Sequence, residues 1–449
     1  MKKLFGTDGI RGVANRDLTP ELAFRIGRIT ASLLREKTKH SVILIGRDTR
    51  LSGGMLEGAL AAGITSAGIS VRLLGIIPTP GVAYLARSLP VAAGVVISAS
   101  HNPIEYNGLK VFDHSGLKLS DEIEREIEGL YFAYDRSSGK MPRPEGVGVG
   151  RITDDGEAAR LYLEHLKGLS SPLLGMRLVI DCGYGAAGRF AGELLEQLGA
   201  KVSVLHGEPD GERINVNCGA TDTAILQREV PRRGADAGLA FDGDADRLIA
   251  VDEKGSAVDG DAIMSICAID MMQQGTLKNS TLVATVMSNG GLDLLAEQHG
   301  FRLVRAAVGD RYVLEEMLAG GYNLGGEQSG HIIFSDHSTT GDGLLTALRL
   351  LSIVARSGLP LSELAGRLRR IPQVLYNLPI TTQKGWLENP IIAAAIDTLR
   401  GKLGQHSRIL VRASGTEPLI RIMLEAPLPE EDLWEEARRL AGIIAREQG

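Results

Sequence analysis

Residues 95–104 read Val-Val-Ile-Ser-Ala-Ser-His-Asn-Pro-Ile and place a polar loop directly behind an apolar run. The first three residues are β-branched and apolar, which is typical of a buried strand. The Asn-Pro pair then favours a turn. Ser100 and His101 are therefore expected on a loop at the end of a rigid strand, where functional residues are common. A plain polar strand end is the alternative, and the other polar loops of the chain decide between the two.

Strand and helix patterns alternate along most of the chain, which is typical of βαβ units and α/β layers. Beyond Pro372 the pattern changes to strands that alternate like an antiparallel sheet, followed by a helix with acidic residues first. The sequence predicts three α/β domains and a smaller α+β C-terminal domain, with boundaries at 1–153, 154–255, 256–370 and 371–449. The predicted strands are 41–46, 71–74, 91–97, 177–181, 201–205, 237–241, 248–252, 281–286, 302–306, 374–378, 408–413 and 419–425; the predicted helices are 54–67, 154–169, 261–273, 341–357 and 429–447; a turn is predicted at 78–80.

The composition is that of an ordinary globular protein, with 449 residues of which 44% are hydrophobic. A net charge of −6 argues against nucleic acid or an anionic membrane as the main partner. Cys182, Cys218 and Cys267 give no disulfide framework and do not have the spacing of a zinc site. We find no apolar signal region and no apolar run of about 18 residues, so we expect a cytoplasmic protein without a transmembrane helix.

Residues 242–247, Asp-Gly-Asp-Ala-Asp-Arg, follow the predicted strand 237–241. Alternate positions place three carboxylates on one side of an extended loop, and such hard oxygen ligands suit Mg²⁺. A calcium EF-hand loop is an alternative, but Arg247 stands where that loop needs glycine. A solvated acidic turn is another, although a cation beside three carboxylates favours a place where a phosphate meets a metal. The candidate ligands are Asp242, Asp244 and Asp246.

Two further loops have the chemistry of a sugar phosphate site. Residues 325–331 offer a carboxylate, an amide, a hydroxyl and an imidazole between glycines, which suits vicinal sugar hydroxyls. Residues 412–418, with Arg421 beyond them, combine guanidinium groups, hydroxyls and glycine in the manner of a phosphate site. A glycine-rich turn and a polar hairpin are the respective alternatives. Arg11 lies on another glycine-rich loop, and Lys110 lies ten residues after Ser100.

Residues 183–188, Gly-Tyr-Gly-Ala-Ala-Gly, match the dinucleotide-binding fingerprint in spacing and context. That site needs an acidic residue at the end of the next strand to hold a ribose, whereas His206 and Gly207 stand there. An NAD-dependent enzyme is therefore an alternative from another reaction class, and close helix–strand packing is the preferred interpretation of these glycines.

Together, the loops at 5–12, 98–103, 242–247, 326–331 and 412–418 resemble those of the α-D-phosphohexomutases, and the resemblance covers the whole chain. It implies three similar α/β domains with mixed sheets and a smaller α+β domain around a central cleft. It also implies that Ser100 bears the transferable phosphate and is needed in that form for activity. One Mg²⁺ per subunit would be held by Asp242, Asp244 and Asp246, with the Ser100 phosphate completing the site.

The same resemblance assigns roles to the remaining polar residues. Glu327 and Ser329 would hold sugar hydroxyls. The phosphate that does not react would be held by Arg412, Ser414, Gly415, Thr416 and Arg421. Charge stabilisation or proton transfer would fall to Arg11, Lys110, Arg247 and His331, with His101 as a positioning residue.

Residues 308–313 and Gln328 favour the branch that acts on glucosamine phosphates over those that act on mannose or glucose phosphates, which are the alternative. The implied activity interconverts glucosamine 6-phosphate and glucosamine 1-phosphate through a 1,6-bisphosphate, for amino-sugar nucleotide and cell-wall precursor synthesis. The expected partners are small sugar phosphates, without nucleic acid or membrane, and a homodimer is compatible with them. A hydrolase that admits water, or a sensor that binds without turnover, would use part of the same equipment.

Overall fold

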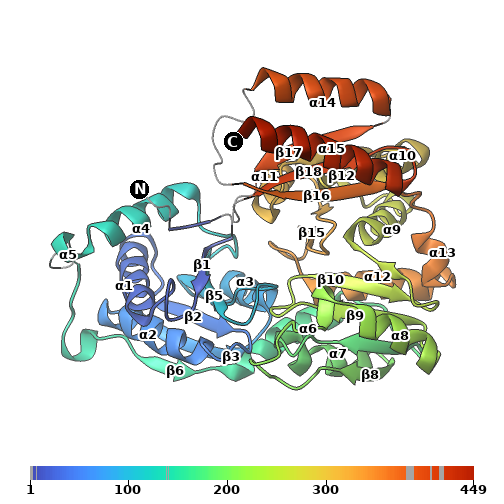
Figure 1. The fold of residues 1–449 in the computed structure, drawn as a ribbon. Helices are drawn as coiled ribbons and strands as arrows, with labels where there is room; N and C mark the ends of the chain where they lie inside the picture. Colours follow the sequence, from blue (N-terminus) through green and yellow to red (C-terminus); the bar gives the residue numbers. More distant parts are fainter. Residues whose placement is uncertain are drawn as a thin grey trace. The chain divides into compact units, whose positions relative to one another are not determined.

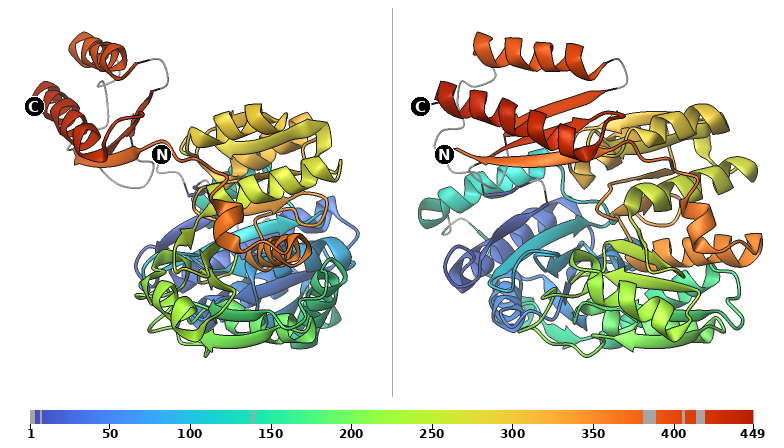
Figure 2. Two further views of the ribbon diagram at one scale, coloured as in Figure 1. Left: turned by 90° about the vertical axis from the view of Figure 1, so that its right-hand side faces the viewer. Right: turned by 45° about the vertical axis from the view of Figure 1, so that its right-hand side comes forward.

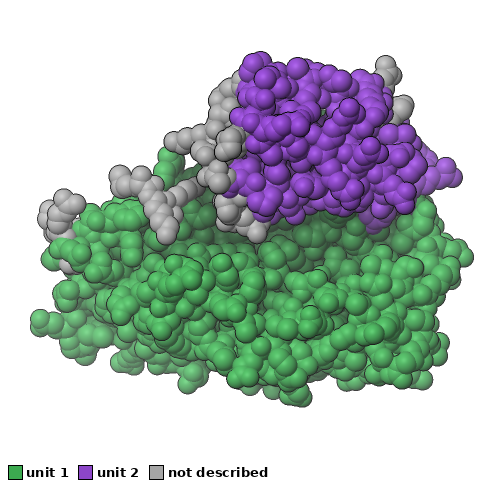
Figure 3. All heavy atoms as spheres, viewed as in Figure 1, with its two compact units in different colours: residues 1–287, 301–367 green, residues 288–300, 368–449 purple. Residues whose placement is uncertain are grey.

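The structure, a computed structural model, falls into two compact units, which Figure 3 colours separately. Unit 1 comprises residues 1–287 and 301–367, and unit 2 comprises residues 288–300 and 368–449. Unit 1 holds three sheets and unit 2 holds one. The residues described are 4–6, 8–137, 139, 141–380, 389–404, 407–413 and 419–448.

The first sheet has six strands in the order β1-β5-β4-β2-β3-β6. Figure 1 labels all of them except β4. Strands β4, β2, β3 and β6 run parallel, whereas β5 pairs antiparallel with β4 and β1. All five residues of β4 are buried, as expected for a parallel strand within a sheet. The strands are Ile10–Val13 (β1), Val42–Arg47 (β2), Ser70–Ile76 (β3), Ala93–Ile97 (β4), Tyr106–Asp113 (β5) and Ile152–Asp154 (β6).

The first sheet and the helices that pack on it form the first block, and the second and third sheets with their helices form the second and third blocks. Two helices of the first block begin at side-chain caps, Thr19 and Ser120. Thr19 accepts a hydrogen bond from the Leu22 amide at 3.2 Å, and a proline follows in the first turn of α1. Helix α1 packs closely on α2, because a Cβ at Gly63 would lie 2.1 Å from the Phe24 carbonyl oxygen. The helices are Pro20–Lys37 (α1), Gly53–Ser66 (α2), Thr79–Ser88 (α3), Asp121–Phe132 (α4) and Tyr134–Ser137 (α5).

The second and third sheets have the orders β11-β10-β9-β7-β8 and β13-β12-β14-β15. Their strands are Arg177–Asp181 (β7), Lys201–Leu205 (β8), Ala237–Phe241 (β9), Leu248–Asp252 (β10), Ala257–Val258 (β11), Thr281–Thr285 (β12), Arg302–Ala306 (β13), Leu324–Gly326 (β14) and Ile332–Phe334 (β15). Their helices in unit 1 are Ala159–Gly168 (α6), Ala191–Gln197 (α7), Ala224–Arg233 (α8), Gly260–Gln273 (α9), Asp310–Gly320 (α11), Gly343–Ser357 (α12) and Leu361–Ala365 (α13).

One strand arrangement recurs in all three sheets of unit 1. The segments β5-β4-β2-β3, β10-β9-β7-β8 and β15-β14-β12-β13 have the same order and the same parallel and antiparallel pairings. Each includes one antiparallel hairpin, and the connection of that hairpin is a polar loop singled out in the sequence. These loops are 98–105, 242–247 and 327–331.

Unit 2 contains an antiparallel sheet of three strands in the order β16-β18-β17. Helices α14 and α15 lie on one side of this sheet and share its apolar core, which includes Ile420, Ile422 and Leu433 (Figure 2). The first turn of α15 is acidic, as the helix dipole favours. The elements are Gly291–His299 (α10), Gln373–Pro379 (β16), Pro390–Leu403 (α14), Arg408–Ala413 (β17), Leu419–Glu425 (β18) and Glu430–Gln448 (α15).

The predicted fold class is confirmed, since three similar α/β blocks precede a smaller α+β block. Two local predictions are wrong. The helix predicted over 154–169 starts only at Ala159, because Ile152–Asp154 pairs with β3 as strand β6. The turn predicted at 78–80 is the start of α3, where proline is tolerated in the first turn. No helix among the described residues is long and apolar enough to span a bilayer.

Candidate active site

Ser100 is held in a strained position at the end of β4. Its φ of 52° lies in the left-handed region, which residues other than glycine rarely adopt. Its amide donates to Ser98 Oγ at 2.8 Å, and its own Oγ donates to Asp242 Oδ2 at 2.6 Å. The hydroxyl also lies 3.3 Å from Nδ1 of His101. The first and second blocks therefore meet at this hydroxyl.

A buried arginine fixes the backbone of the Ser100 loop. The Arg50 side chain is fully buried against Asp48, with Nε 3.0 Å from Asp48 Oδ2. Asp48 in turn accepts a hydrogen bond from Ser98 Oγ at 2.6 Å. The guanidinium donates to four carbonyl oxygens of the loop, which belong to Ser100 (2.9 Å), Asn102 (2.7 Å), Pro103 (2.6 Å) and Tyr106 (2.9 Å). One side chain thus determines the path of the loop.

The three aspartates of the β9–β10 hairpin form a buried cluster. Asp242 and Asp244 are fully buried and Asp246 is 4% exposed, and the three offer carboxylate oxygens within 4.8 Å of one another. Burial, together with the carboxylates of Asp246 and Asp244, raises the pKa of Asp242 well above its ordinary value. Oδ1 of Asp244 and Oδ1 of Asp246 accept no hydrogen bond from the described residues. Uncompensated buried oxygens of this kind fit a hard divalent cation such as Mg²⁺.

Lys110 links this cluster to the N-terminal loop. Its Nζ, on strand β5, lies 2.9 Å from Asp244 Oδ2, 3.2 Å from Asp246 Oδ2 and 3.2 Å from Asp8 Oδ2. Burial alone would lower the pKa of Lys110, but these carboxylates hold it well above the ordinary value, so the ammonium stays charged. Asp8 also pairs with Arg11 and Lys118, and Lys118 pairs with Asp310 of the third block.

Two cations flank the Ser100 loop. Arg11 Nη1 donates to Asn102 Oδ1 at 3.0 Å. Arg247 donates its amide to Asp242 Oδ1 at 3.2 Å, and its Nε lies 3.8 Å from Asp246 Oδ1. Burial and these two guanidinium groups lower the pKa of His101 to about 3. The His101 imidazole is therefore neutral near pH 7.

Thr79 supports the aspartate cluster from the first turn of α3. Its Oγ1 donates to Asp244 Oδ2 at 2.6 Å, and its amide donates to the Asp244 carbonyl oxygen at 2.9 Å. The residue is 1% exposed. Helix α3 thus orients one candidate metal ligand through two hydrogen bonds.

The predicted sugar loop is fastened to the second block. The Leu248 amide donates to the Gly330 carbonyl oxygen at 3.0 Å. Gly330 has a φ of 91°, and a Cβ there would lie 2.2 Å from the Leu248 carbonyl oxygen, so only glycine fits. Glu327 is half-buried and accepts from the Gly309 amide at 3.1 Å, whereas Ser329 is exposed. The loop therefore presents one hydrogen-bonded carboxylate and one exposed hydroxyl.

His331, at the end of this loop, joins the third block to the aspartates. Its Nδ1 lies 3.7 Å from Asp246 Oδ2, and its Nε2 lies 3.6 Å from Asp310 Oδ2. The Gly341 amide lies 2.9 Å from Nε2. Burial alone would lower the pKa of His331, but the carboxylates of Asp246, Asp310 and Glu327 raise it above the ordinary value.

Unit 2 carries the predicted phosphate arginines. Arg412 on β17 and Arg421 on β18 are register partners, so their side chains share one face of the sheet. Ser414, Gly415 and Thr416 lie outside the described residues. Unit 1 brings together most of the other predicted site residues, namely Ser100, His101, Lys110, Arg11, Arg247, Asp242, Asp244, Asp246, Glu327 and His331. Ser329 is exposed on the same loop as Glu327.

Sequence reasoning missed the supporting residues of the site. Asp8 and Thr79 gave no separate signal, and each reaches the cluster from a segment more than a hundred residues away from the aspartates. The sequence analysis likewise assigned no role to Asp48 and Arg50, which follow strand β2. An Asp-x-Arg motif directly after an apolar strand is the sequence pattern that could have indicated a residue pair holding a neighbouring loop.

The glycines at 183–188 serve packing. A Cβ at Gly185 would lie 2.4 Å from the Gly243 carbonyl oxygen, and one at Gly188 would lie 2.0 Å from the Gly207 carbonyl oxygen. A short 3₁₀ turn over Ala186–Arg189 follows, ahead of α7. These close backbone contacts support the packing interpretation over the dinucleotide one.

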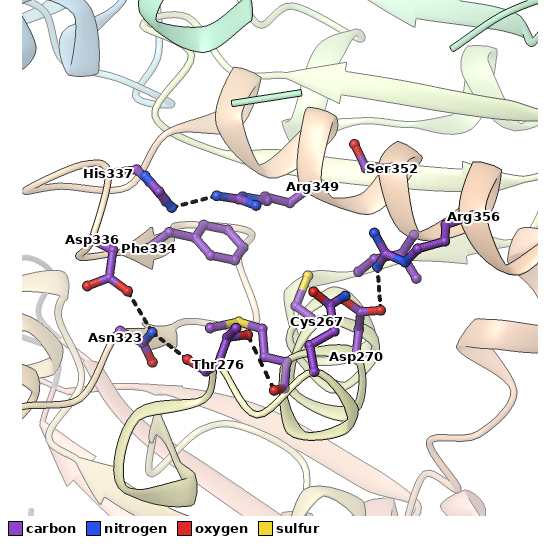
Figure 4. A pocket seen from close by; sticks show the side chains of 13 residues that line it. Cys267, Asp270, Thr276, Asn323, Phe334, Asp336, His337, Arg349, Ser352 and Arg356 are labelled. Carbon is purple, nitrogen blue, oxygen red and sulfur yellow. Dashed lines mark hydrogen bonds and ion pairs between the residues drawn. The ribbon is translucent and has the colours of Figure 1, made fainter. Parts of the chain in front are cut away.

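A separate cavity of about 240 Å³ lies in the third block between α9, α12 and the β14–β15 hairpin. Figure 4 shows Arg349 pairing with His337 and Arg356 pairing with Asp270 at its wall. None of the predicted site residues lines it. The aspartate cluster with Ser100 is therefore the candidate active site.

Comparison with known proteins agrees with this geometry. Four phosphoglucomutase/phosphomannomutase models match in order: alpha/beta/alpha domain I over 2–138, domain II over 160–255, domain III over 259–371 and the C-terminal domain over 375–443. The phosphoglucosamine mutase of Symbiobacterium thermophilum is 57% identical over 95% of this chain and 95% of that protein. That of a Thermoanaerobacter species is 52% identical over 99% of both.

A solved structure shares the whole architecture. The phosphoglucomutase/phosphomannomutase family protein of Burkholderia thailandensis matches with a TM-score of 0.82 and 25% identity, over 100% of this chain and 99% of that one. With four family models in order and near-complete relatives above 50% identity, the chain belongs to the phosphoglucomutase/phosphomannomutase family, among the phosphoglucosamine mutases.

Proposed function

We propose that this chain interconverts glucosamine 6-phosphate and glucosamine 1-phosphate through a phosphoserine at Ser100 and a glucosamine 1,6-bisphosphate intermediate. The observation that carries the proposal is the position of Ser100. Its backbone has a strained positive φ, and its hydroxyl lies 2.6 Å from Asp242 in a cluster of buried carboxylates. The names of the two curated relatives support the glucosamine phosphate as substrate.

The reaction needs no co-substrate, because the phosphoryl group moves only between Ser100 and the sugar. In the forward direction the C1 hydroxyl oxygen of glucosamine 6-phosphate attacks the phosphorus on Ser100. An O–P bond forms, and the bond from phosphorus to Ser100 Oγ breaks with its electron pair on Oγ. The proton of the attacking hydroxyl ends on Oγ, so Ser100 becomes a neutral hydroxyl. After the bisphosphate turns end for end, Ser100 Oγ attacks the C6 phosphate and the steps reverse.

The residues around Ser100 position and neutralise the phosphoryl group. Asp242, Asp244 and Asp246 would hold one Mg²⁺, which supplies positive charge to the oxygens of the transferring group. Lys110 and Arg247 keep fixed cations beside the cluster. His101 is neutral, so its ring helps to place the Ser100 hydroxyl without adding charge.

The substrate needs contacts that survive its reorientation. Glu327 and Ser329 would hold sugar hydroxyls that both poses share. In unit 2, Arg412 and Arg421 share one sheet face and would hold the phosphate that is not reacting, together with Ser414, Gly415 and Thr416. The partners are then small sugar phosphates, and light scattering tests whether the protein forms a homodimer.

One set of assays tests this proposal. Glucosamine, glucose and mannose 6-phosphates are compared in a coupled assay, and phosphopeptide mapping locates the phosphate. We expect glucosamine 6-phosphate to be the best substrate, Ser100→Ala to lose nearly all activity, and Ser357→Ala, a substitution at an exposed helix end, to keep it.

Other outcomes separate the alternatives. Mannose 6-phosphate as the best substrate would contradict the sugar assignment alone. Release of inorganic phosphate would indicate a hydrolase, and binding without turnover a sensor. Full activity after exhaustive chelation would show that the reaction needs no metal. Full activity of Ser100→Ala would show that the reaction does not use a phosphoserine at this position.

A further inference from the structure

A second group of ligand-forming side chains lies in unit 1, at the carboxyl ends of β7 and β8. Asp181 is the last residue of β7, and His206 directly follows β8, which runs parallel to β7. Cys218 comes from the loop that follows His206. The three residues offer a carboxylate oxygen, an imidazole nitrogen and a sulfur within 4.8 Å of one another.

The carboxylate of this group is incompletely satisfied. Asp181 is fully buried, and its Oδ1 accepts from the Gly183 amide at 3.0 Å and lies 3.0 Å from His206 Nδ1. Its Oδ2 is also buried and has no hydrogen-bond partner in the described part of the chain. A buried carboxylate oxygen without a partner is costly, and a cation at this place would satisfy it.

We propose that Asp181, His206 and Cys218 form a structural zinc site, distinct from the aspartate cluster of the active site. Sulfur, imidazole and carboxylate are the usual ligands of Zn²⁺, and three protein ligands leave the fourth tetrahedral position to water. A sulfur ligand is foreign to Mg²⁺, which prefers oxygen. The ligand types therefore separate the two sites chemically.

The present geometry is close to that of a tetrahedral site. Bonds of about 2.0–2.3 Å to zinc place neighbouring ligand atoms roughly 3.3–3.6 Å apart. The Asp181 and His206 atoms are already 3.0 Å apart. Cys218 Sγ lies 3.9 Å from the Arg213 carbonyl oxygen, a long contact that a shift of its rotamer can release. Cys218 Sγ lies within 4.8 Å of the other two ligand atoms, so a change of its rotamer suffices to bring it to bonding distance.

The segments that this site joins also support Ser100. The loop between His206 and Cys218 carries Asn215, whose Nδ2 donates to the Ser100 carbonyl oxygen at 2.9 Å. Tyr184, three residues after Asp181, accepts at its carbonyl oxygen from Thr49 Oγ1 at 2.7 Å. Zinc would therefore fasten the second block at the point where it contacts the Ser100 loop.

Cobalt and zinc titrations of the full chain test the proposal. The protein is stripped with a chelator and saturated with Mg²⁺, so that the aspartate cluster is occupied, and is then titrated with Co²⁺. We expect one equivalent to produce the near-ultraviolet absorption of a cobalt–thiolate bond, and Zn²⁺ to displace it. His206→Gln should weaken zinc binding at least tenfold, and Cys218→Ser should abolish the cobalt–thiolate absorption.

The two other cysteines provide matched controls. Cys267→Ser changes a buried cysteine on α9, and Cys182→Ser changes the neighbour of Asp181, so both should keep the absorption and the zinc affinity. Absence of the thiolate absorption in the unmodified protein overturns the proposal whatever the variants do. Its persistence in Cys218→Ser, or unchanged zinc affinity in His206→Gln, also overturns it.

Discussion

Arg50→Lys tests whether one buried guanidinium determines the path of the Ser100 loop. The arginine side chain makes five hydrogen bonds, one to Asp48 and four to loop carbonyls. A lysine keeps the charge but has only three donors, so at least two of the five acceptors lose their partner. If the pair with Asp48 persists, both are loop carbonyls. At about 1–3 kcal/mol for each orphaned buried carbonyl, the substitution costs about 2–6 kcal/mol. The bonds to the Asn102, Pro103 and Tyr106 carbonyls are only part-buried, so water places the loss in the lower half of that range.

The effect on turnover follows from position rather than charge. Displacing the Ser100 hydroxyl by about an ångström is expected to lower kcat on the order of a hundredfold. KM for glucosamine 6-phosphate should change little, because Arg50 contacts no residue of the sugar loop. Hydrogen exchange should report faster opening of residues 98–106.

Arg47→Lys is the matched control, since Arg47 ends strand β2 three residues before Arg50 and pairs with Glu57. It should leave kcat and the exchange rates of the loop nearly unchanged. If Arg50→Lys kept full kcat with unaltered exchange over 98–106, the view that this arginine positions Ser100 would be wrong.

Three further substitutions probe other contacts. Thr79→Val removes the hydroxyl bonded to Asp244, so activation should need about 10–100-fold more Mg²⁺ while kcat at saturating Mg²⁺ largely recovers; a metal titration of activity checks this. Burial raises the pKa of Asp342 to about 6 from an ordinary 3.8, so its contribution to stability falls as pH rises from about 4 through 6. Between pH 4 and pH 7 the free energy of unfolding of Asp342→Asn should therefore rise by up to ~3 kcal/mol relative to that of the parent, as measured by unfolding at both pH values. An equal difference between the two proteins at both pH values would contradict this. Arg421→Ala should weaken binding of both the 1- and the 6-phosphate in calorimetry, and a loss confined to one of them would contradict a shared phosphate site.

The sequence was sufficient for the fold class and for placing the polar loops at strand ends. Strands 177–181, 201–205, 237–241 and 248–252 coincide with β7 to β10, because continuous apolar runs bounded by polar turns have few other interpretations. The strand that carries Lys110 was not predicted, since Tyr106–Asp113 mixes glycine, asparagine and lysine with its apolar residues. Its pairing with β4 depends on tertiary contacts that local propensity does not report.

The supporting contacts of the site could not be predicted from the sequence, because they too depend on tertiary structure. Asp8 and Thr79 are common residue types in ordinary contexts, and their meaning arises only when folding brings them to Lys110 and Asp244. The spacing of the cysteines argued against a zinc site, because motif spacing detects ligands from one or two short segments. Asp181, His206 and Cys218 come together from separate segments, at neighbouring strand ends and a following loop.

The hairpin that recurs in each block of unit 1 allows each hairpin loop to change its sequence independently of the other two. If the proposed function holds, the loop 98–105 carries the phosphoryl group, 242–247 the metal-binding carboxylates and 327–331 the sugar contacts. Each loop is the same connection of the same strand arrangement. A hairpin tip can be replaced while its two strands and their neighbours stay in register. Substrate preference can therefore diverge through the third tip while the first two keep the chemistry intact. Exchanging residues 327–331 between relatives of different sugar preference is the smallest graft that would transfer specificity.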